Sequence, residues 1–511
     1  MNLTKKTTLT ILLVIILLGA ALRFYNLGAT SFVADEFLDI NSSMAYAKTG
    51  VWQNWDFNFG QVNSENAFEA RDSRAWIYKW QVAQILKTFG TSEASARSIS
   101  VLWGLISIVL IYFVATYFTK KKEIGLIAAA LFAISITGII FDRRLRMYAM
   151  FFPVFLAFSW MLFKFLEEEY QGKIVMAKYF YEKLKINLIY FIPMAILGAI
   201  CILTHQLTGN IIIIFFVYAM VLAALEYRKN KNLFNKYALG LGSIVAGFIL
   251  GKVIFPKQLE TYTAGIDFPN SHWSYIINVF SDYNNLILAL TFLAAGIYYL
   301  YKNENLRKES LWLSISFFSV LLSAILLWNR NVGDQYIFFI ESFSIILIAC
   351  GIYALLWFLN ENLTKFGRKI VLVPLILIFL ILPNWAYFFQ TPNVYRQTSE
   401  SDNVNYKKIF SYFIKSRKAE DVLVTRNFRN FYWNGKKIKV FSFGGEISHD
   451  KLTLSEIQEI VSQNTSGWVI ISENDNVYIA NDAEEWIDKN LTKVSNSYVR
   501  GKVLVYRWGN N

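Results

Sequence analysis

The 511-residue chain repeats one pattern along most of its length, in which stretches of mostly apolar residues alternate with short polar segments. A helix needs about 20 such residues to cross the hydrocarbon core of a bilayer. The pattern therefore predicts a mainly α, polytopic membrane protein with about eleven transmembrane helices. The predicted spans are residues 8–27, 98–118, 124–141, 148–166, 187–204, 208–226, 237–255, 283–301, 311–328, 336–358 and 370–389.

The basic residues predict how these spans are oriented. The formal net charge is +13, but Lys and Arg cluster in alternate loops, such as Lys120–Lys122 and Arg228–Lys231. Cytoplasmic loops of membrane proteins are rich in these residues. We therefore expect a multi-pass protein of the plasma membrane with a cytoplasmic N-terminus, in contact with membrane lipids. The same distribution argues against nucleic acid as a partner.

Residues 76–89 are apolar on one side only and carry Lys79 and Lys87. If this segment crossed the bilayer, the basic loops downstream of it would face outward, against the usual trend. It is better described as a helix that lies in the outer interface. Residues 28–97 are accordingly predicted to form one long outer loop with interfacial helices.

Beyond Pro383 the composition becomes polar and mixed. Strands that alternate with helices predict a small α/β domain, and the last span places it outside the cytoplasm. We expect a transmembrane catalytic domain at 1–390 and a soluble extracytoplasmic domain at 391–511. The strands and the one amphipathic helix expected in the second domain are residues 420–425, 466–472, 502–508 and 452–463.

Two adjacent acids, Asp35 and Glu36, follow the outer end of the first span. A carboxylate beside a bilayer loses water, and its pKa then rises toward that of a usable general base. The alternative is a helix N-cap, in which Asp35 accepts hydrogen bonds from backbone N–H groups. The spacing alone leaves both interpretations open.

A second polar group, Asp142-Arg143-Arg144-Leu145-Arg146-Met147-Tyr148, ends the third span. Arginines in an outer loop depart from the usual charge distribution, and charges at membrane depth are costly and usually functional. Guanidinium groups make forked hydrogen bonds to phosphate, so the cluster fits a lipid-linked phosphate. The alternative is that the side chains extend to ordinary lipid headgroups. Asp142 is expected either to orient an arginine or to hold a divalent metal.

Further polar residues fall on the same predicted membrane face, and their convergence indicates a site there. A lone histidine is more often structural than a ligand, and the sequence has no paired histidine motif for zinc. The further residues expected to line the site are Arg74, Arg97, His205, Arg330 and Tyr336.

Three segments carry a family resemblance: RFYNLG with SFVADE at 23–36, SEASARSISVLWGLISIVLIYFVA at 92–115, and GLIAAALFAISITGIIFDRRLRMYAM at 125–150. Together they resemble the polyprenyl-phosphate-sugar glycosyltransferases of the GT-C type, glycosyltransferase family 39. That group includes the protein O-mannosyltransferases and the aminoarabinose transferases that act on lipid A. The resemblance covers residues 8–230 well and the remainder only in architecture.

The resemblance implies an inverting transferase of hexosyl or pentosyl groups. Its donor would be a polyprenyl-phosphate-linked sugar, and its acceptor a hydroxyl of a protein, lipid or glycan at the outer membrane face. By resemblance, Asp35 is the general base and Glu36 shapes the site beside it. The donor phosphate and sugar would be bound by Asp142, Arg143, Arg146, Tyr148 and Arg97.

The chain also departs from the family pattern. Many relatives carry His-Pro-Pro or a similar motif at the start of the interfacial helix, where this chain has Asp72-Ser73-Arg74-Ala75-Trp76. We therefore expect recognition of the acceptor or donor, more than the chemistry, to differ from that of these relatives. Some members of the superfamily use a divalent ion. This sequence shows no clear ligand set, so the metal question stays open and no cofactor is assigned.

Two other functions compete with the transferase. A transporter or flippase for a lipid-linked precursor typically carries polar residues and broken helices near the bilayer midplane, whereas these spans are apolar in the middle. A non-catalytic envelope protein could bind a partner through the outer domain. In that case the Asp-Glu pair and the arginine cluster would have no purpose.

Overall fold

The computed structural model describes most of the chain. The described residues are 3–62, 73–231, 235–254, 256, 260, 265–266, 268–329, 332–363, 372–390, 393–396, 406–426, 433, 437–443, 451–494 and 502–509. They divide into two compact units, one formed by residues 1–24 and 100–386, the other by 25–99 and 387–511. The predicted domain boundary at residue 390 stays a prediction.

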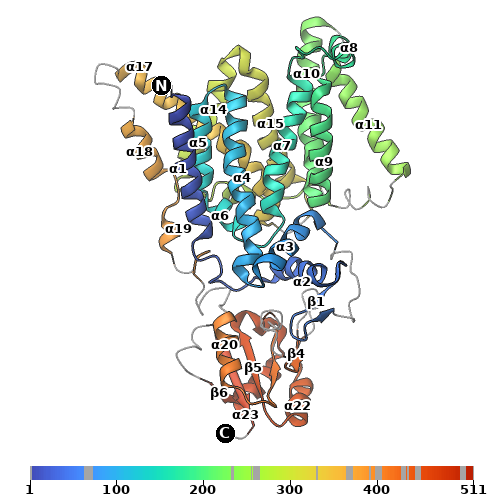
Figure 1. Ribbon diagram of the computed structural model, residues 1–511, viewed down its shortest axis with the longest axis vertical. Coiled ribbons are helices and arrows are strands. Elements are labelled where there is room, and N and C mark those ends of the chain that lie inside the picture. The colour runs from blue at the N-terminus through green and yellow to red at the C-terminus, as the bar shows by residue number, and fades with distance from the viewer. Residues whose placement is uncertain are drawn as a thin grey trace. The chain divides into compact units, whose positions relative to one another are not determined.

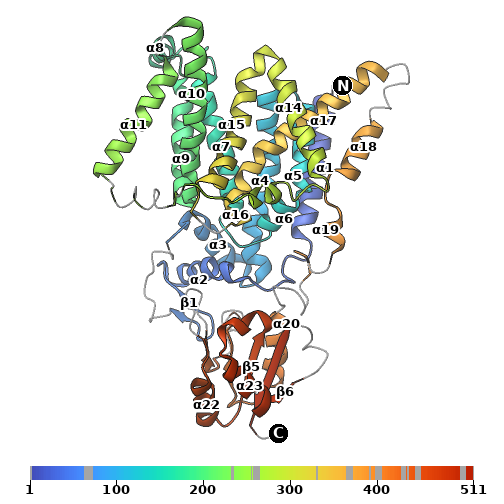
Figure 2. The ribbon, with the colours of Figure 1, turned by 180° about the vertical axis from the view of Figure 1, so that it is seen from behind.

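The first unit is a bundle of apolar helices, several of which lie side by side in both ribbon views (Figures 1 and 2). The helices in its apolar runs are α1 (Lys5–Phe24), α4 (Glu93–Thr119, which begins in the second unit), α5 (Lys122–Ala133), α6 (Ile136–Asp142), α7 (Tyr148–Glu167), α9 (Phe191–Thr204), α10 (Asn210–Asn230), α11 (Lys236–Ile254), α14 (Leu286–Lys302), α15 (Arg307–Leu326), α17 (Glu341–Leu363) and α18 (Leu372–Ile381). Short elements join them: α8 (Val175–Leu184), η2 (Leu188–Tyr190), η3 (Gln206–Gly209), α13 (Ser274–Val279), η4 (Glu304–Leu306), α16 (Asp334–Ile337) and η5 (Phe338–Ile340). The next element, α19 (Ala386–Phe389), begins at the last residue of this unit and lies otherwise in the second.

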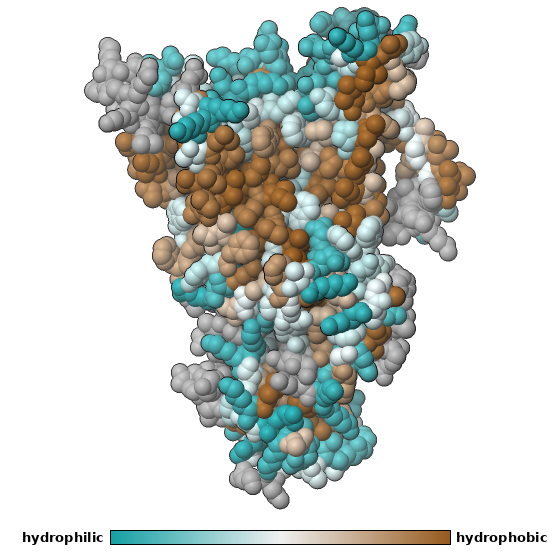
Figure 3. Space-filling view, in the orientation of Figure 1, coloured by the Kyte–Doolittle hydropathy of each residue, from teal (hydrophilic) through white to brown (hydrophobic). Residues whose placement is uncertain are grey.

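The bundle is that of a multi-pass membrane protein. Within the described residues, seven helices are long and apolar enough to cross a bilayer, or nine if each of two bent helix pairs is one span. Helices occupy all eleven predicted positions, but α14 is shorter than a full span, so the count of eleven is not confirmed. A broad apolar surface covers the helices in the space-filling view, with polar residues toward the ends (Figure 3).

Glycines allow α14 and α17 to cross closely. A Cβ atom on Gly296 would lie 1.9 Å from the carbonyl oxygen of Leu347, and one on Gly351 would lie 1.9 Å from that of Phe292. Helices in membranes associate through such small residues, because lipid provides no hydrophobic force that drives them together.

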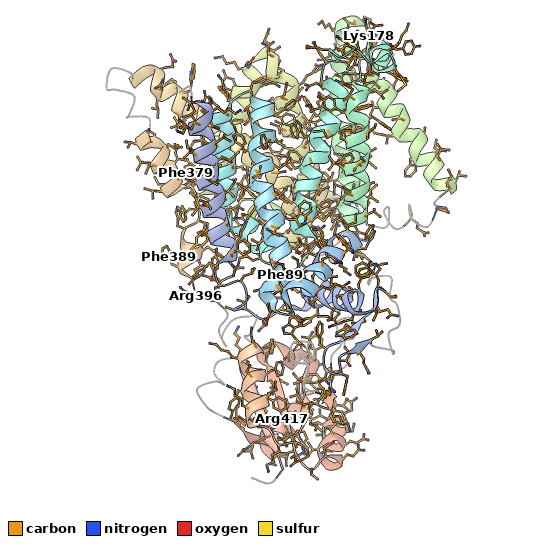
Figure 4. All side chains as sticks on the ribbon, viewed as in Figure 1. Phe89, Lys178, Phe379, Phe389, Arg396 and Arg417 are labelled. Atoms are coloured by element: carbon orange, nitrogen blue, oxygen red, sulfur yellow. The ribbon has the colours of Figure 1, made fainter. Side chains whose placement is uncertain are left out.

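The second unit combines the predicted outer loop with the C-terminal domain. Its loop part contains α2 (Ala34–Thr49), the short strands β1 (Trp55–Asp56) and β2 (Gln61–Val62), and α3 (Trp76–Phe89). The position of α3 confirms the helix predicted at 76–89; Phe89 at its end is 70% exposed (Figure 4). Asn58 ties this loop to the C-terminal domain, because its side chain both donates to and accepts from the backbone of Ile438.

The C-terminal domain is a five-stranded mixed sheet in the order β4-β3-β5-β7-β6. Its elements are α20 (Tyr406–Ser416), β3 (Val422–Val424), β4 (Val440–Phe441), α22 (Leu454–Gln463), β5 (Gly467–Ser472), η8 (Glu473–Tyr478), α23 (Asn481–Asn490), β6 (Thr492–Lys493) and β7 (Val503–Trp508). β3 runs parallel to β4 and β5, whereas β7 is antiparallel to β5 and β6.

The α/β class predicted for this domain is confirmed. The three predicted strands and the predicted helix all form, and the helix begins with a capping box between Thr453 and Glu456. α20 packs on one face of the sheet through Phe410 and Phe413. α22 and α23 cover the other face. Helices α20 and α23 and the two-residue strands were not predicted from the sequence.

Candidate active site

Arg97 organises the polar group that follows the first span. All three guanidinium nitrogens donate hydrogen bonds, and the side chain is buried. Nη1 donates to the carbonyls of Leu27 and Thr30 at 3.1 and 2.9 Å, and Nη2 to that of Ser31 at 3.0 Å. Nε and Nη2 form a forked pair with the Glu36 carboxylate, both at 2.8 Å. Arg97 therefore anchors the chain from residue 27 to residue 36.

Glu36 and Asp35 are neighbours in opposite environments. Glu36 is fully buried and also accepts a hydrogen bond from the backbone N–H of Val33 at 2.9 Å, which closes the start of α2. Asp35 lies in the same first turn and is exposed. Val33 occupies the N-cap position, so the interpretation of Asp35 as an N-cap is wrong. The geometry favours positioning roles for Glu36 and Arg97.

A buried ion pair joins the next two helices of this unit. Lys79 on α3 lies 3.6 Å from Asp39 on α2, and both side chains are at most 4% exposed. The sequence showed Lys79 only as a polar interruption of the apolar face of 76–89. Its acidic partner lies 40 residues earlier, in a segment with no helical pattern strong enough to predict the contact.

In the first unit, Asp142 is paired with an arginine from the end of α1. Arg23 Nε donates to Asp142 Oδ2 at 2.7 Å, and both side chains are buried. Arg23 also donates to the carbonyls of Ala133 and Phe132 at 2.8 and 3.2 Å. The Asp142 carboxylate packs directly against α4, where Gly104 leaves room for it. A Cβ atom on Gly104 would lie only 2.2 Å from Asp142 Oδ2.

A break between α5 and α6 directs Asp142 toward α1. The two helices meet at 62°, and Ser135 caps α6 by accepting from the Gly138 N–H at 2.8 Å. Asp282 accepts from both the N–H and the hydroxyl of Thr137, each at 2.8 Å. Burial raises the pKa of Asp282 above its ordinary value, although these hydrogen bonds oppose the shift. Asp282 was not predicted from the sequence.

The arginines that follow Asp142 are held between α6 and α7. Arg143 and Arg146 are 3% and 9% exposed. Arg143 Nη1 donates to the carbonyl of Arg23 at 2.7 Å, and the Arg146 guanidinium lies 5.7 Å from the ring centroid of Tyr148. The ring of Tyr148 packs 5.1 Å from that of His205. Asp142, Arg143, Arg146, Tyr148 and His205 are thus brought together at one end of the bundle.

The His205 side chain stabilises the turn that follows it. Its ring is 4% exposed, and Nδ1 accepts from the backbone N–H of Leu207 at 3.1 Å. Phe338 stacks on Phe141 at 4.6 Å and on Phe152 at 4.7 Å, which fixes the turn that carries the arginines. The sequence did not predict these contacts of Phe338, because it showed only a high aromatic content.

The other predicted residues are spread more widely. Arg74 is exposed in the turn before α3, and Tyr336 is half-buried in α16. Arg330 lies outside the described residues. Among the residues that the structure describes, no three His, Cys, Asp or Glu side chains are grouped to hold a metal ion.

No protein-family model and no curated protein sequence matches the chain. Solved structures do resemble it. The oligosaccharyltransferase of Archaeoglobus fulgidus, tethered to an acceptor peptide, superposes with a TM-score of 0.55 at 12% identity, over 98% of this chain and 74% of that one. ArnT from Cupriavidus metallidurans bound to undecaprenyl phosphate gives 0.53 at 13% identity, over 97% of both chains.

A further structure of the archaeal enzyme, AglB, contains an inhibitory peptide and a dolichol-phosphate, and superposes with a TM-score of 0.55 at 12% identity, over 95% of this chain and 72% of that one. At such low identity the likeness shows a shared fold. The predicted GT-C-like fold is therefore confirmed.

Proposed function

We propose that the protein is an inverting membrane glycosyltransferase that moves a sugar from a polyprenyl-phosphate-linked donor to an acceptor hydroxyl. One observation carries the proposal: two buried arginines are fixed at one end of a bundle whose fold is shared with proteins whose structures were solved with bound lipid phosphates. Buried charges at a bilayer face are costly and usually serve a function.

In this proposal Arg143 and Arg146 bind the donor phosphate. A guanidinium matches phosphate geometry with paired N–H groups. The Arg23–Asp142 pair holds the segment that carries them, because Arg143 is bound to the carbonyl of Arg23. Tyr148 and His205 pack beside Arg146 and restrict its side chain. The cationic groups are thereby ordered before a ligand arrives, which lowers the entropic cost of binding.

Asp35 acts as the general base. It is the exposed member of the Asp35–Glu36 pair, and its turn is fixed by Glu36 and Arg97. Along the chain, α4 carries both Arg97 and Gly104, the residue that lies beside Asp142.

The reaction needs one displacement. The acceptor oxygen gives its proton to the Asp35 carboxylate and bonds to the anomeric carbon as the bond from that carbon to the phosphate oxygen breaks. The electron pair of the broken bond leaves with the polyprenyl phosphate, whose charge the arginines balance. A single in-line displacement inverts the anomeric configuration. Transfer of a hexosyl or pentosyl group at the outer face of the plasma membrane is part of the proposal.

The deciding experiment separates transfer from transport. The full-length protein is reconstituted in vesicles with undecaprenyl-phosphate-linked monosaccharides that carry a labelled sugar, together with membrane extract as acceptor. We expect the label to leave the lipid and free undecaprenyl phosphate to appear. Movement of intact labelled lipid between leaflets, without cleavage, would instead establish the flippase.

Asp35→Asn should lower the rate of transfer by about 100- to 10,000-fold and leave the protein folded. Asp482 provides a matched control, since it is an exposed acid in the first turn of α23, and Asp482→Asn should retain full activity. Normal activity in Asp35→Asn would remove this residue from the mechanism.

A further inference from the structure

The opposite end of the bundle carries a second polar cluster, which glycosyl transfer does not use. α7 begins at Tyr148, beside the arginines, and ends at Glu167. A helix of 20 residues is about 30 Å long, the thickness of the hydrocarbon core. Glu167 therefore lies at the other membrane face from Arg143 and Arg146.

Glu167 is the centre of this second cluster. Its side chain is 3% exposed, and its carboxylate accepts from Lys308 at 2.6 Å, Lys236 at 3.3 Å and the Tyr237 hydroxyl at 2.8 Å. These partners come from α15 and α11. The buried glutamate thus holds two lysines from different helices at the rim of the bundle.

A polar cavity of about 420 Å³ opens beside Glu167. Lys183 and Lys185, both exposed, line it at the end of α8. Its walls carry four lysines against three glutamates, which leaves one positive charge. These charged residues are Lys183, Lys185, Lys236, Lys308, Glu167, Glu169 and Glu226.

The cavity lies next to a helix suited to the lipid interface. α8 meets the η2–α9 helix at 111°, and both ribbon views show it beside the ends of α9 and α10 (Figures 1 and 2). Ile174, Val175 and Met176 at its start are exposed, Val175 by 82%. Lys178 projects at the end of the bundle (Figure 4). α8 thus combines exposed apolar side chains with lysines, and a helix of mixed apolar and basic character lies at the interface with its apolar side chains below the headgroups.

We propose that this cavity binds the headgroup of an anionic phospholipid, in the leaflet opposite the candidate active site. The phosphate diester carries one negative charge, which complements the single excess positive charge of the walls. Lys183, Lys185 and Lys308 reach the phosphate, while the tails lie against the apolar start of α8. Basic clusters at a membrane surface bind anionic lipids in this way.

The test measures lipid retention by native mass spectrometry. The full-length protein is exchanged into detergent with equimolar phosphatidylglycerol and phosphatidylcholine of identical acyl chains. We expect wild-type protein to retain phosphatidylglycerol preferentially. The double variant Lys183→Gln with Lys185→Gln should lose this preference by about tenfold or more. Both lysines are exposed, so the fold should survive, and size-exclusion chromatography checks this.

The matched control is Lys229→Gln with Lys231→Gln. These lysines are exposed at the end of α10, at the same membrane face, and do not line the cavity. The proposal is overturned if the control variant loses phosphatidylglycerol as strongly as the test variant, or if neither loses it. It is also overturned if millimolar glycerol 3-phosphate displaces the lipid completely, since the cavity would then take a soluble phosphate.

Discussion

The two ends of α7 hold positive charge in different ways. At its start, Arg23, Arg143 and Arg146 are buried and bound in fixed positions by a carboxylate, by backbone carbonyls and by aromatic rings. At its end, Lys308 is half-exposed and shares Glu167 with Lys236. Arginine binds several acceptors at once in a planar fork, whereas lysine is a compact, hydrated charge on a flexible stem.

This difference teaches what each end can do. A rigid, desolvated set of guanidinium groups suits a ligand that must be aligned for a reaction. Exposed lysines suit a headgroup that exchanges with the surrounding lipid. We therefore expect substitutions at the arginine end to lower stability or ligand affinity more than matched substitutions at the lysine end.

Removing Arg23 should have the largest effect. Arg23→Ala leaves the Asp142 carboxylate buried without its partner, and such loss costs about 3–5 kcal/mol. Chemical unfolding in detergent micelles measures the change in the free energy of unfolding. Arg307→Ala is the control, because Arg307 is an exposed arginine paired with Glu304, and it should change stability little. Equal losses in the two variants would contradict the comparison.

Gly104→Ala tests the packing that positions Asp142. The new methyl group would lie 2.2 Å from the carboxylate oxygen, so Asp142 or α4 must move, at a cost of about 1–3 kcal/mol. Gly242→Ala on α11 meets no atom within 4 Å and should stabilise the helix by about 0.5–1 kcal/mol. Thermal unfolding should therefore show a lower melting temperature for Gly104→Ala and a higher one for Gly242→Ala. A shift in the same direction for both variants would show that Asp142 is not packed tightly against Gly104.

Arg146→Lys keeps the charge and removes the fork. We expect the affinity for undecaprenyl phosphate to fall about tenfold, which corresponds to about 1.4 kcal/mol. Binding to the purified protein measures this directly. Arg144→Lys, at the half-buried arginine two residues earlier, should change affinity much less. Equal losses would mean that general positive charge, and not the geometry of Arg146, binds the phosphate.

The smallest effect is expected at the lysine end. Lys308→Gln leaves Glu167 bound to Lys236 and Tyr237, and a half-exposed ion pair contributes at most about 1 kcal/mol. Chemical unfolding in micelles should thus barely separate this variant from the wild type. A loss as large as that of Arg23→Ala would show that the two ends are equally rigid.

The sequence predicted what depends on local patterns. Apolar runs located the long helices of the bundle, one-sided polarity located α3, and an amphipathic pattern located α22. These features need only neighbours along the chain. The fold class followed from the number of runs and from the change in composition after Pro383.

The contacts that organise the site could not be predicted from local patterns. Arg23 and Asp142 lie 119 residues apart, and nothing local marks them as partners. Arg97 was expected to bind the donor, yet its nitrogens are bound to Glu36 and to the 27–31 backbone. The residue type indicated an anion-binding group correctly, but only the packing determines which anion it meets.

The union of the 25–99 loop with the C-terminal domain has one more consequence. Lys407 pairs with Glu93 at 3.1 Å, its backbone N–H donates to the Ser31 hydroxyl, and the ring of Phe32 meets that of Trp433 at 4.8 Å. We expect segments joined by such contacts to unfold together. The residues around Asp35 therefore depend on Lys407 and Trp433, so a ribosome must synthesise the chain beyond residue 433 before that turn acquires its native support.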